Sequence, residues 1–169
     1  MVEVFDTTIQ EAMPDKPKCE VKIMEMGAGS GLLGLELNKK GYTNLDALDT
    51  SQKMLDQAKK KGVYTKFICS NLTEKRTPGI QDGEYNALIL SGVVALVYIK
   101  PLAFHEMMRV VSNGGCPFCL CFPDDFKRPT SNHNLVWVTI TYNNNTTTNK
   151  INSKNKLHLL RNILLQQFL

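Results

Sequence analysis

Residues 25–31 read EMGAGSG and place three glycines and a carboxylate between two apolar segments. The run VKIMEM (21–26) is typical of a buried strand, and GLLGLELNKK (31–40) has the apolar spacing of a helix. Glycines at such a junction let a ligand approach the main chain, whose free N–H groups gather at the start of the helix. The stretch therefore predicts a strand, a tight turn and a helix that together hold a nucleotide-like ligand.

Strands and helices alternate along the chain beyond this turn. A short amphipathic helix is expected near residues 5–13. The expected strands are 21–26, 44–49, 64–69, 85–93 and 116–122, and the expected longer helices are 31–40, 51–61 and 102–111. Alternation at this spacing indicates a parallel sheet, and near-continuous apolar strands fit a sheet covered on both faces. The fold class that follows is α/β, with a doubly wound, mostly parallel sheet.

The alternation stops after Phe122. We therefore expect a core over residues 1–122 and a divergent or truncated tail over 123–169. The tail contains a possible strand at 135–142, a low-complexity Asn/Thr/Lys-rich tract at 143–156 and a helix at 157–169 that is apolar nearly all round. We interpret the tract as a long loop or a disordered stretch. This interpretation leaves the edge of the sheet near the fifth strand poorly covered.

The glycines can be read in two registers. In the first, an acid-x-G-x-G-x-G pattern begins at Glu25; in the second, the G-x-G-x-x-G of dinucleotide binding runs from Gly29 to Gly34. We favour the first, because Gly27 already occupies the end of the strand and a pyrophosphate would be repelled by Glu25. A carboxylate suits a cationic ligand end such as an α-amino group. Asp49, about 20 residues further on, could accept hydrogen bonds from ribose hydroxyls in either register.

Taken together, these motifs resemble the class I S-adenosylmethionine-dependent methyltransferases. Residues 21–62 resemble the cofactor half of that family, with EMGAGSG as its first motif and LDALDTSQKMLDQA (45–58) as its second. YNALILSGV (85–93) resembles the fourth strand, and FHEMMRVVSNGG (104–115) the helix and turn before the fifth. The segments GLLGLELNKKGY (31–42) and DTSQKMLDQAKKKGVY (49–64) are especially similar to the small methyltransferase-like proteins of the Williams–Beuren region. The resemblance covers roughly residues 20–122.

The resemblance implies a Rossmann-like methyltransferase fold, S-adenosyl-L-methionine as cofactor and a place for each motif residue. Glu25 would orient the methionine amino group through the loop or a water, and Asp49 would bind the ribose hydroxyls. The expected cofactor-binding residues are Glu25, Gly27, Ala28, Gly29, Gly31, Asp49, Thr50, Met54, Asn71, Leu72 and Ser91. Five of them keep a structural alternative: Glu25 and Asp49 as strand-end carboxylates, Met54 as helix core, Asn71 as a turn cap and Ser91 as a strand exit.

Methyl transfer from a sulfonium mainly requires that the acceptor be positioned, and a base is needed only for some acceptors. The sequence accordingly nominates no catalytic residue. We predict a methyltransferase that acts on a small-molecule or protein acceptor. Two alternatives stay open: a non-catalytic or truncated methyltransferase-like protein, and an NAD-dependent oxidoreductase. The family's N-terminal segment over the cofactor and its antiparallel strands after the fifth are both expected to be shortened here.

The composition of the chain limits the number of domains, the cellular compartment and the kinds of partner that we expect. A chain of 169 residues with 43% hydrophobic content suits one domain. No apolar run reaches membrane-spanning length, and the first residues lack the pattern of a signal peptide. Five cysteines without zinc-ligand spacing indicate a reducing, cytoplasmic setting without a metal site, with the nucleus left open. The net charge of +4 comes partly from lysines at expected helix ends, so nucleic acid is not an expected partner. The oligomeric state is not predicted.

Overall fold

The structure is a computed structural model that describes residues 2–91, 103–122, 136–143 and 146–152. The expected helix at 157–169 and the end of the strand expected at 85–93 lie outside the described residues. The strands are β1 (Ile23–Met26), β2 (Leu45–Asp49), β3 (Lys66–Cys69), β4 (Tyr85–Ser91), β5 (Val111–Phe122), β6 (Val136–Asn143) and β7 (Thr146–Asn152). The helices are α1 (Val2–Ala12), the 3-10 turn η1 (Lys18–Glu20), α2 (Leu32–Lys39), α3 (Gln52–Lys59) and α4 (Ala103–Val110).

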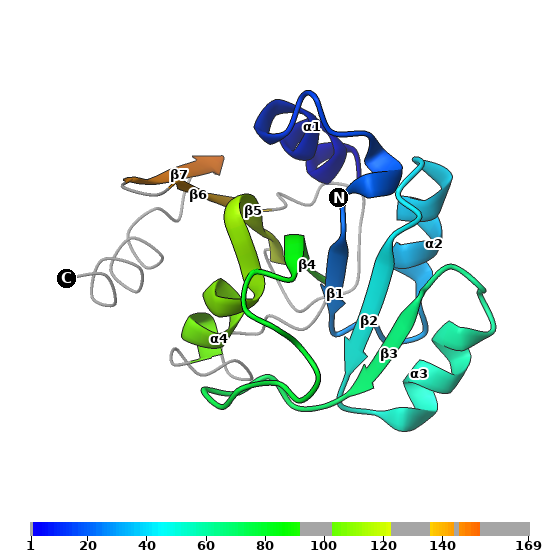
Figure 1. Ribbon diagram of the computed structural model, residues 1–169. Coiled ribbons are helices and arrows are strands. Elements are labelled where there is room, and N and C mark those ends of the chain that lie inside the picture. The colour runs from blue at the N-terminus through cyan, green and yellow to red at the C-terminus, as the bar shows by residue number, and fades with distance from the viewer. Residues whose placement is uncertain (1, 92–102, 123–135, 144–145, 153–169) are drawn as a thin grey trace.

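The strands form one sheet in the order β3-β2-β1-β4-β5-β6-β7 (Figure 1). β1 pairs in parallel with β2 on one side and with β4 on the other, and β3 and β5 continue the parallel pairing outward. β6 and β7 then add antiparallel strands. The five parallel strands confirm the predicted α/β fold class.

Alternate residues of the strands face opposite sides of the sheet. Ile23 and Ile89 belong to a buried cluster that includes side chains of α1, α2 and α3, whereas Met24 and Leu90 belong to a second cluster with α4. Figure 1 shows α4 on the other side of the strands from α2 and α3. Each fully buried aliphatic side chain contributes about 1.5–3 kcal/mol, which is why the central strands are apolar on both faces.

Glycines and a serine cap set the ends of α2 and α3. Gly31 has φ +80° immediately before α2, and Gly41 has φ +96° just after it. Ser51 caps α3, because its hydroxyl accepts a hydrogen bond from the Met54 N–H at 3.4 Å, and Gly62 follows the helix with φ +66°. These left-handed positions favour glycine and confirm the predicted helix ends.

The helix expected near residues 5–13 is α1, and it packs at the amino ends of the strands. The Phe5 ring meets the Tyr42 ring edge-on at 5.6 Å, and the Tyr42 hydroxyl donates to Asp6 at 2.8 Å. Lys18 forms an ion pair with Asp6 at 2.6 Å. Tyr42 lies three residues before the start of β2, so α1 lies at the opposite end of the sheet from the glycine turn (Figure 1). α1 therefore lies away from the glycine turn, and it does not form the N-terminal cover that we expected to be shortened in this chain.

β5 begins at Val111, five residues before the strand expected at 116–122. Its pairing with β4 shifts register twice, between the pairs Tyr85↔Val111, Ala87↔Cys116 and Ile89↔Cys119. The SNGG stretch that we expected to be a turn falls within the first shift. Pro117 falls within the second, and a proline has no N–H for a ladder and is found at such irregularities.

The tail differs from the sequence expectation. β6 matches the strand expected at 135–142, but the low-complexity tract contains β7, which pairs antiparallel with β6 from Asn143↔Thr146 to Trp137↔Asn152. Residues Thr146–Asn152 therefore form a strand and not the loop that we expected. Threonine has a high strand propensity, and the main chain of β6 offers a hydrogen-bonding partner that no local pattern reveals. β6 also covers the edge of β5 that we expected to be exposed.

Candidate cofactor site

The turn between β1 and α2 is built from three left-handed glycines. Gly27, Gly29 and Gly31 have φ of +77°, +54° and +80°. Any other L-residue would cost about 1–2 kcal/mol at each position. The N–H groups of Gly27 and Ala28 donate to the Leu48 carbonyl at 2.7 and 3.0 Å, so the turn is held against the end of β2.

The geometry separates the two glycine registers. Gly34 lies within α2 and has no positive φ, and a Cβ there would overlap the hydroxyl end of Tyr64. Gly34 therefore makes room for a side chain from the protein itself. At Gly29, by contrast, an added Cβ would meet nothing within 4 Å. Gly29 belongs to both registers, whereas the left-handed Gly27 directly after β1 belongs only to the acid-x-G-x-G-x-G register that begins at Glu25.

Asp49 ends β2 and joins the turn to the start of α3. Its Oδ2 accepts from the Gly29 N–H and its Oδ1 from the Ser51 N–H, each at 2.8 Å. The side chain is half-buried, and each carboxylate oxygen keeps a further lone pair for an outside donor. Asp49 can therefore accept hydrogen bonds from a pair of ligand hydroxyls beside Gly29.

Glu25 lies beneath the turn and is only 1% exposed. Its Oε2 accepts a hydrogen bond from the Tyr64 hydroxyl at 2.7 Å. Burial raises the pKa of Glu25 to about 7, with a further push from the charge of Asp49, while hydrogen bonds from Tyr64 and the Gly34 main chain act the other way. When it is ionised, a carboxylate at this position can attract a cationic group on the other side of the turn through its charge.

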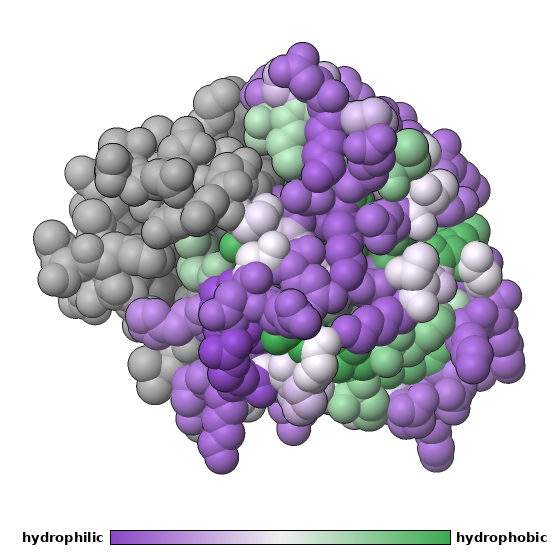
Figure 2. All heavy atoms as spheres, in the orientation of Figure 1, coloured by the Kyte–Doolittle hydropathy of each residue, from purple (hydrophilic) through white to green (hydrophobic). Residues whose placement is uncertain are grey.

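Two large apolar side chains are exposed at the first turns of α2 and α3. Leu32 is 64% exposed and Met54 is 46% exposed. Met54 therefore does not share the buried face of Leu55 and Ala58, and its alternative as helix core is wrong. Figure 2 shows hydrophobic surface among hydrophilic side chains in the region of β2, β3 and α3. Exposed apolar groups beside an open main chain suit a flat, weakly polar ring.

Sequence reasoning missed Leu32. Its position could have indicated it, because Leu32 is the first helical residue after the glycine turn and an apolar side chain there is not buried in the core. Of the other expected contacts, Thr50 is exposed directly after Asp49. Gly27, Ala28, Gly29 and Gly31 all lie in the turn.

The segment after β3 adjoins the same edge of the sheet. The Ser70 N–H donates to the Asp49 carbonyl at 3.1 Å, which holds this segment beside the end of β2. Asn71 is exposed, whereas Leu72 is half-buried and packs against the α4-side cluster. Ser91 is the last residue of β4 and pairs with Cys121 of β5.

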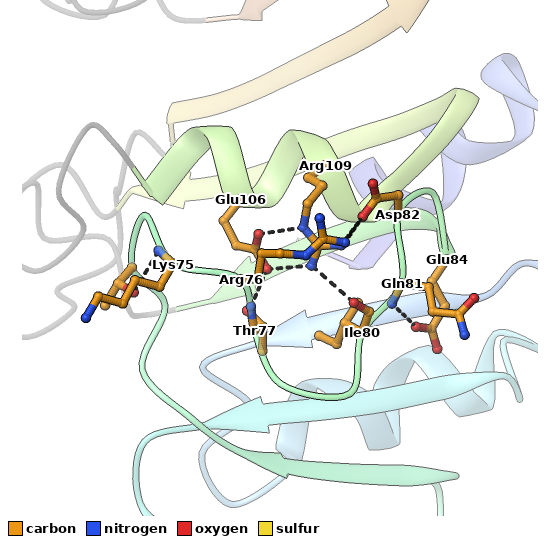
Figure 3. Close-up of polar contacts among 10 residues, drawn as sticks. Lys75, Arg76, Thr77, Ile80, Gln81, Asp82, Glu84, Glu106 and Arg109 are labelled. Atoms are coloured by element: carbon orange, nitrogen blue, oxygen red, sulfur yellow. Dashed lines mark hydrogen bonds and ion pairs between the residues drawn. The ribbon is translucent and has the colours of Figure 1, made fainter.

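A polar network anchors the rest of the β3–β4 connection to α4 (Figure 3). Glu106 accepts from the Thr77 N–H at 2.6 Å and takes two hydrogen bonds from Arg109, each at 2.7 Å. Arg109 also contacts Asp82 and donates to the Ile80 carbonyl at 3.2 Å. Burial raises the pKa of Glu106, but the hydrogen bonds from Arg109 and Thr77 outweigh it and leave that pKa below its usual value. The connection is thus fixed on the side of the sheet that faces α4.

The described residues contain neither a candidate metal site nor a candidate membrane span. No group of three or more His, Cys, Asp and Glu side chains in that part of the chain could hold a metal ion. Within the same residues, every helix is too short or too polar to cross a bilayer. Cys19 and Cys69 are exposed free thiols.

Relatives by sequence point to one family. A family model described as a methyltransferase domain matches residues 23–115. Human methyltransferase-like protein 27 is 28% identical over 107 residues, which make up 63% of this chain and 42% of that protein. The chain thus spans about two fifths of the length of this curated relative.

Solved structures share the fold at low identity. A TehB-like S-adenosylmethionine-dependent methyltransferase from Corynebacterium glutamicum has a TM-score of 0.56 at 17% identity, covering 73% of this chain and 61% of that one. A methyltransferase from Thiobacillus denitrificans, in complex with S-adenosyl-L-homocysteine, has a TM-score of 0.51 at 18% identity, covering 74% and 50%. The family model spans more than half of the chain and includes the glycine turn, Glu25 and Asp49. The chain belongs to the methyltransferase domain family.

Proposed function

We propose that this chain binds S-adenosylmethionine at the carboxyl edge of its sheet and transfers the methyl group to a small-molecule or protein acceptor. The observation that carries the proposal is the open main chain at Gly29, hydrogen-bonded to Asp49 and flanked by left-handed Gly27 and Gly31. The structural relative from Thiobacillus denitrificans supports it, because that protein is in complex with the demethylated cofactor.

The proposed roles follow from position. Asp49 accepts from the ribose hydroxyls, and the turn passes beneath the ribose and the methionine, whose cationic amino group is attracted by Glu25. Met54 and Leu32 pack on the adenine, with Thr50, Asn71 and Leu72 at its edge and Ser91 toward the acceptor. Bound S-adenosylmethionine supplies a methyl group already activated on a sulfonium, so the protein contributes mainly positioning.

Three further points belong to the proposal. The similarity to methyltransferase-like protein 27 supports a methyltransferase-like role, and the finer resemblance to the small Williams–Beuren-region proteins remains part of the proposal. Residues 1–122 would form the cofactor-binding core, with 123–169 as a divergent tail. The exposed free thiols of Cys19 and Cys69 favour the cytoplasm as the location.

Titration calorimetry with S-adenosylmethionine, S-adenosylhomocysteine and NAD tests the cofactor. We expect the first two to bind and NAD not to bind, because Glu25 beneath the turn would repel the pyrophosphate of NAD. Tight binding of NAD without S-adenosylhomocysteine would overturn the proposal. Binding of none of the three would favour the non-catalytic alternative.

Asp49→Ala provides the matched variant. Loss of its charged hydrogen bonds should weaken S-adenosylhomocysteine binding by about 1.5–3 kcal/mol, or roughly 10- to 150-fold. The control is Asp56→Ala, which removes an exposed carboxylate of α3 that accepts a hydrogen bond from the Gln52 side chain. An unchanged affinity in Asp49→Ala, with circular dichroism like that of the wild type, would show that the ribose is not held there.

A further inference from the structure

Tyr64 lies just before β3 and fills the space next to the glycine turn. It is 9% exposed, and its ring packs edge-on against Phe67 with centroids 5.7 Å apart. A Cβ added at Gly31 would lie 3.0 Å from Tyr64 Cε2 and 3.1 Å from Ala58, and one at Gly34 would overlap the phenol end. The ring therefore rests on main chain that only glycine leaves uncovered, at the end of the turn and in the first part of α2.

The Tyr64 hydroxyl reaches through this space to the buried Glu25. It donates to Glu25 Oε2 at 2.7 Å, across 39 residues of sequence. The Gly34 main chain also hydrogen-bonds Glu25, and Asp49 is the charged group that acts on it from β2. One side chain thus contacts both the packing surface of the turn and the carboxylate beneath it.

We propose that Tyr64 is a positioning residue for the cofactor site, which holds the glycine turn against α3 and keeps Glu25 hydrogen-bonded as a carboxylate. The inference rests on the proposed binding of S-adenosylmethionine. Its consequence is that Tyr64, which need not touch the cofactor, sets the affinity for the cationic amino-acid end of that ligand. Neither the glycine motif nor the spacing of Asp49 assigns this role.

Charge explains why the hydroxyl matters. An ionised Glu25 attracts a cationic group above the turn, whereas a protonated Glu25 does not. Because burial raises the pKa of Glu25 to about 7, the carboxylate changes its ionisation in the neutral range. The hydrogen bond from Tyr64 favours the ionised form, so its removal moves the pKa upward and leaves more of Glu25 protonated at pH 7.

Tyr64→Phe tests the inference, with Tyr85→Phe as its matched control. Tyr85 is also a buried tyrosine that donates to a buried carboxylate, Asp46 Oδ2, at 2.8 Å, but it lies at the amino end of the strands. Calorimetry with S-adenosylhomocysteine at pH 6 to 9 is the readout. In the wild type, affinity should rise as the pH rises through the pKa of Glu25. The amino group of the ligand titrates identically in every variant, so differences report on the protein.

In Tyr64→Phe we expect affinity at pH 7 to fall by about five- to tenfold, because a smaller fraction of Glu25 is then ionised and able to attract the cationic end of the ligand. The midpoint of the pH profile should move to higher pH, while Tyr85→Phe keeps the wild-type affinity and midpoint. In a Glu25→Gln background, Tyr64→Phe should no longer change the pH profile. A merely structural role would lower the melting temperature in both tyrosine variants and leave both profiles alone.

The binding results distinguish a failure of the role of Tyr64 from a failure of the proposed function. Wild-type affinity and midpoint in Tyr64→Phe, or equal losses in both tyrosine variants, would overturn this inference and leave the proposed function intact. Failure of the wild type itself to bind S-adenosylhomocysteine would overturn the proposed function and, with it, the role of Tyr64. If Tyr64→Phe does not fold, Gly34→Ala displaces the same phenol from the other side and should also weaken binding. Wild-type affinity in Gly34→Ala would then overturn the inference.

Discussion

Gly29 and Gly62 form a pair that separates the cost of backbone strain from the cost of blocking a ligand. Both have left-handed backbones, with φ of +54° and +66°, and an added Cβ would meet nothing within 4 Å at either. Alanine should therefore cost about 1–2 kcal/mol of stability at each position. In a chain of this length, that loss lowers the melting temperature by about 2–8 °C. The two positions differ only in what surrounds them: Gly29 adjoins Asp49, whereas Gly62 follows the end of α3.

We expect thermal denaturation to give similar losses for Gly29→Ala and Gly62→Ala. Calorimetry with S-adenosylhomocysteine should separate them, because the methyl group at Gly29 points into the open space where we place the cofactor. Gly29→Ala should lose about tenfold or more in affinity, equivalent to 1.4 kcal/mol, and Gly62→Ala should lose none. Equal affinities in the two variants would refute the placement of the cofactor over the turn.

Three other predictions concern stability. Glu25→Gln should raise the free energy of unfolding by about 1–3 kcal/mol at pH 8 but not at pH 4. The pKa of Glu25 is raised to about 7 in the folded protein, so the wild type loses stability as the pH rises toward that value. Urea unfolding at both pH values checks this. Glu106→Gln should lower the free energy of unfolding by about 1–3 kcal/mol at pH 7 and by less below pH 4. The lowered pKa of Glu106 stabilises the folded protein, and this contribution is lost as the pH falls. Acid titration of a folding signal in both proteins checks this. Phe5→Ala should cost about 3–5 kcal/mol in urea unfolding without changing S-adenosylhomocysteine affinity, because α1 packs at the far end of the strands.

Local signals predicted most of the core. The positions of Gly41 and Gly62 mark helix ends because a left-handed residue must follow the last turn, and this requirement is visible in the sequence. The apolar strands could be predicted because both faces of the parallel sheet are covered. The acid-x-G-x-G-x-G pattern predicted the turn because each of its glycines occupies a conformation that other residues avoid.

Contacts distant in sequence could not be predicted. β7 forms because β6 offers main-chain partners, and the composition of Thr146–Asn152 does not encode that neighbour. Periodicity places Met54 beside Leu55, but only the tilt of α3 on the sheet decides which of the two is buried. The bond between Tyr64 and Glu25 depends on the adjacency of β1, β2 and β3, which the alternation of elements predicts only in outline.

The two ends of the sheet differ in what their polar groups do for stability. At the amino end, the buried Asp46 accepts hydrogen bonds from Tyr85 and Thr65 and lies 3.7 Å from Lys22, so its charge is compensated. At the carboxyl end, three glycines stand in the left-handed region, a buried carboxylate has a raised pKa, and Leu32 is exposed to water. Each of these features costs stability, and they adjoin one another. Local departures from the rules that stabilise the rest of a fold concentrate where a protein binds or reacts. The cost is explained if a ligand with ribose hydroxyls, a cationic end and a flat ring covers the turn, since binding would satisfy all of these groups at once.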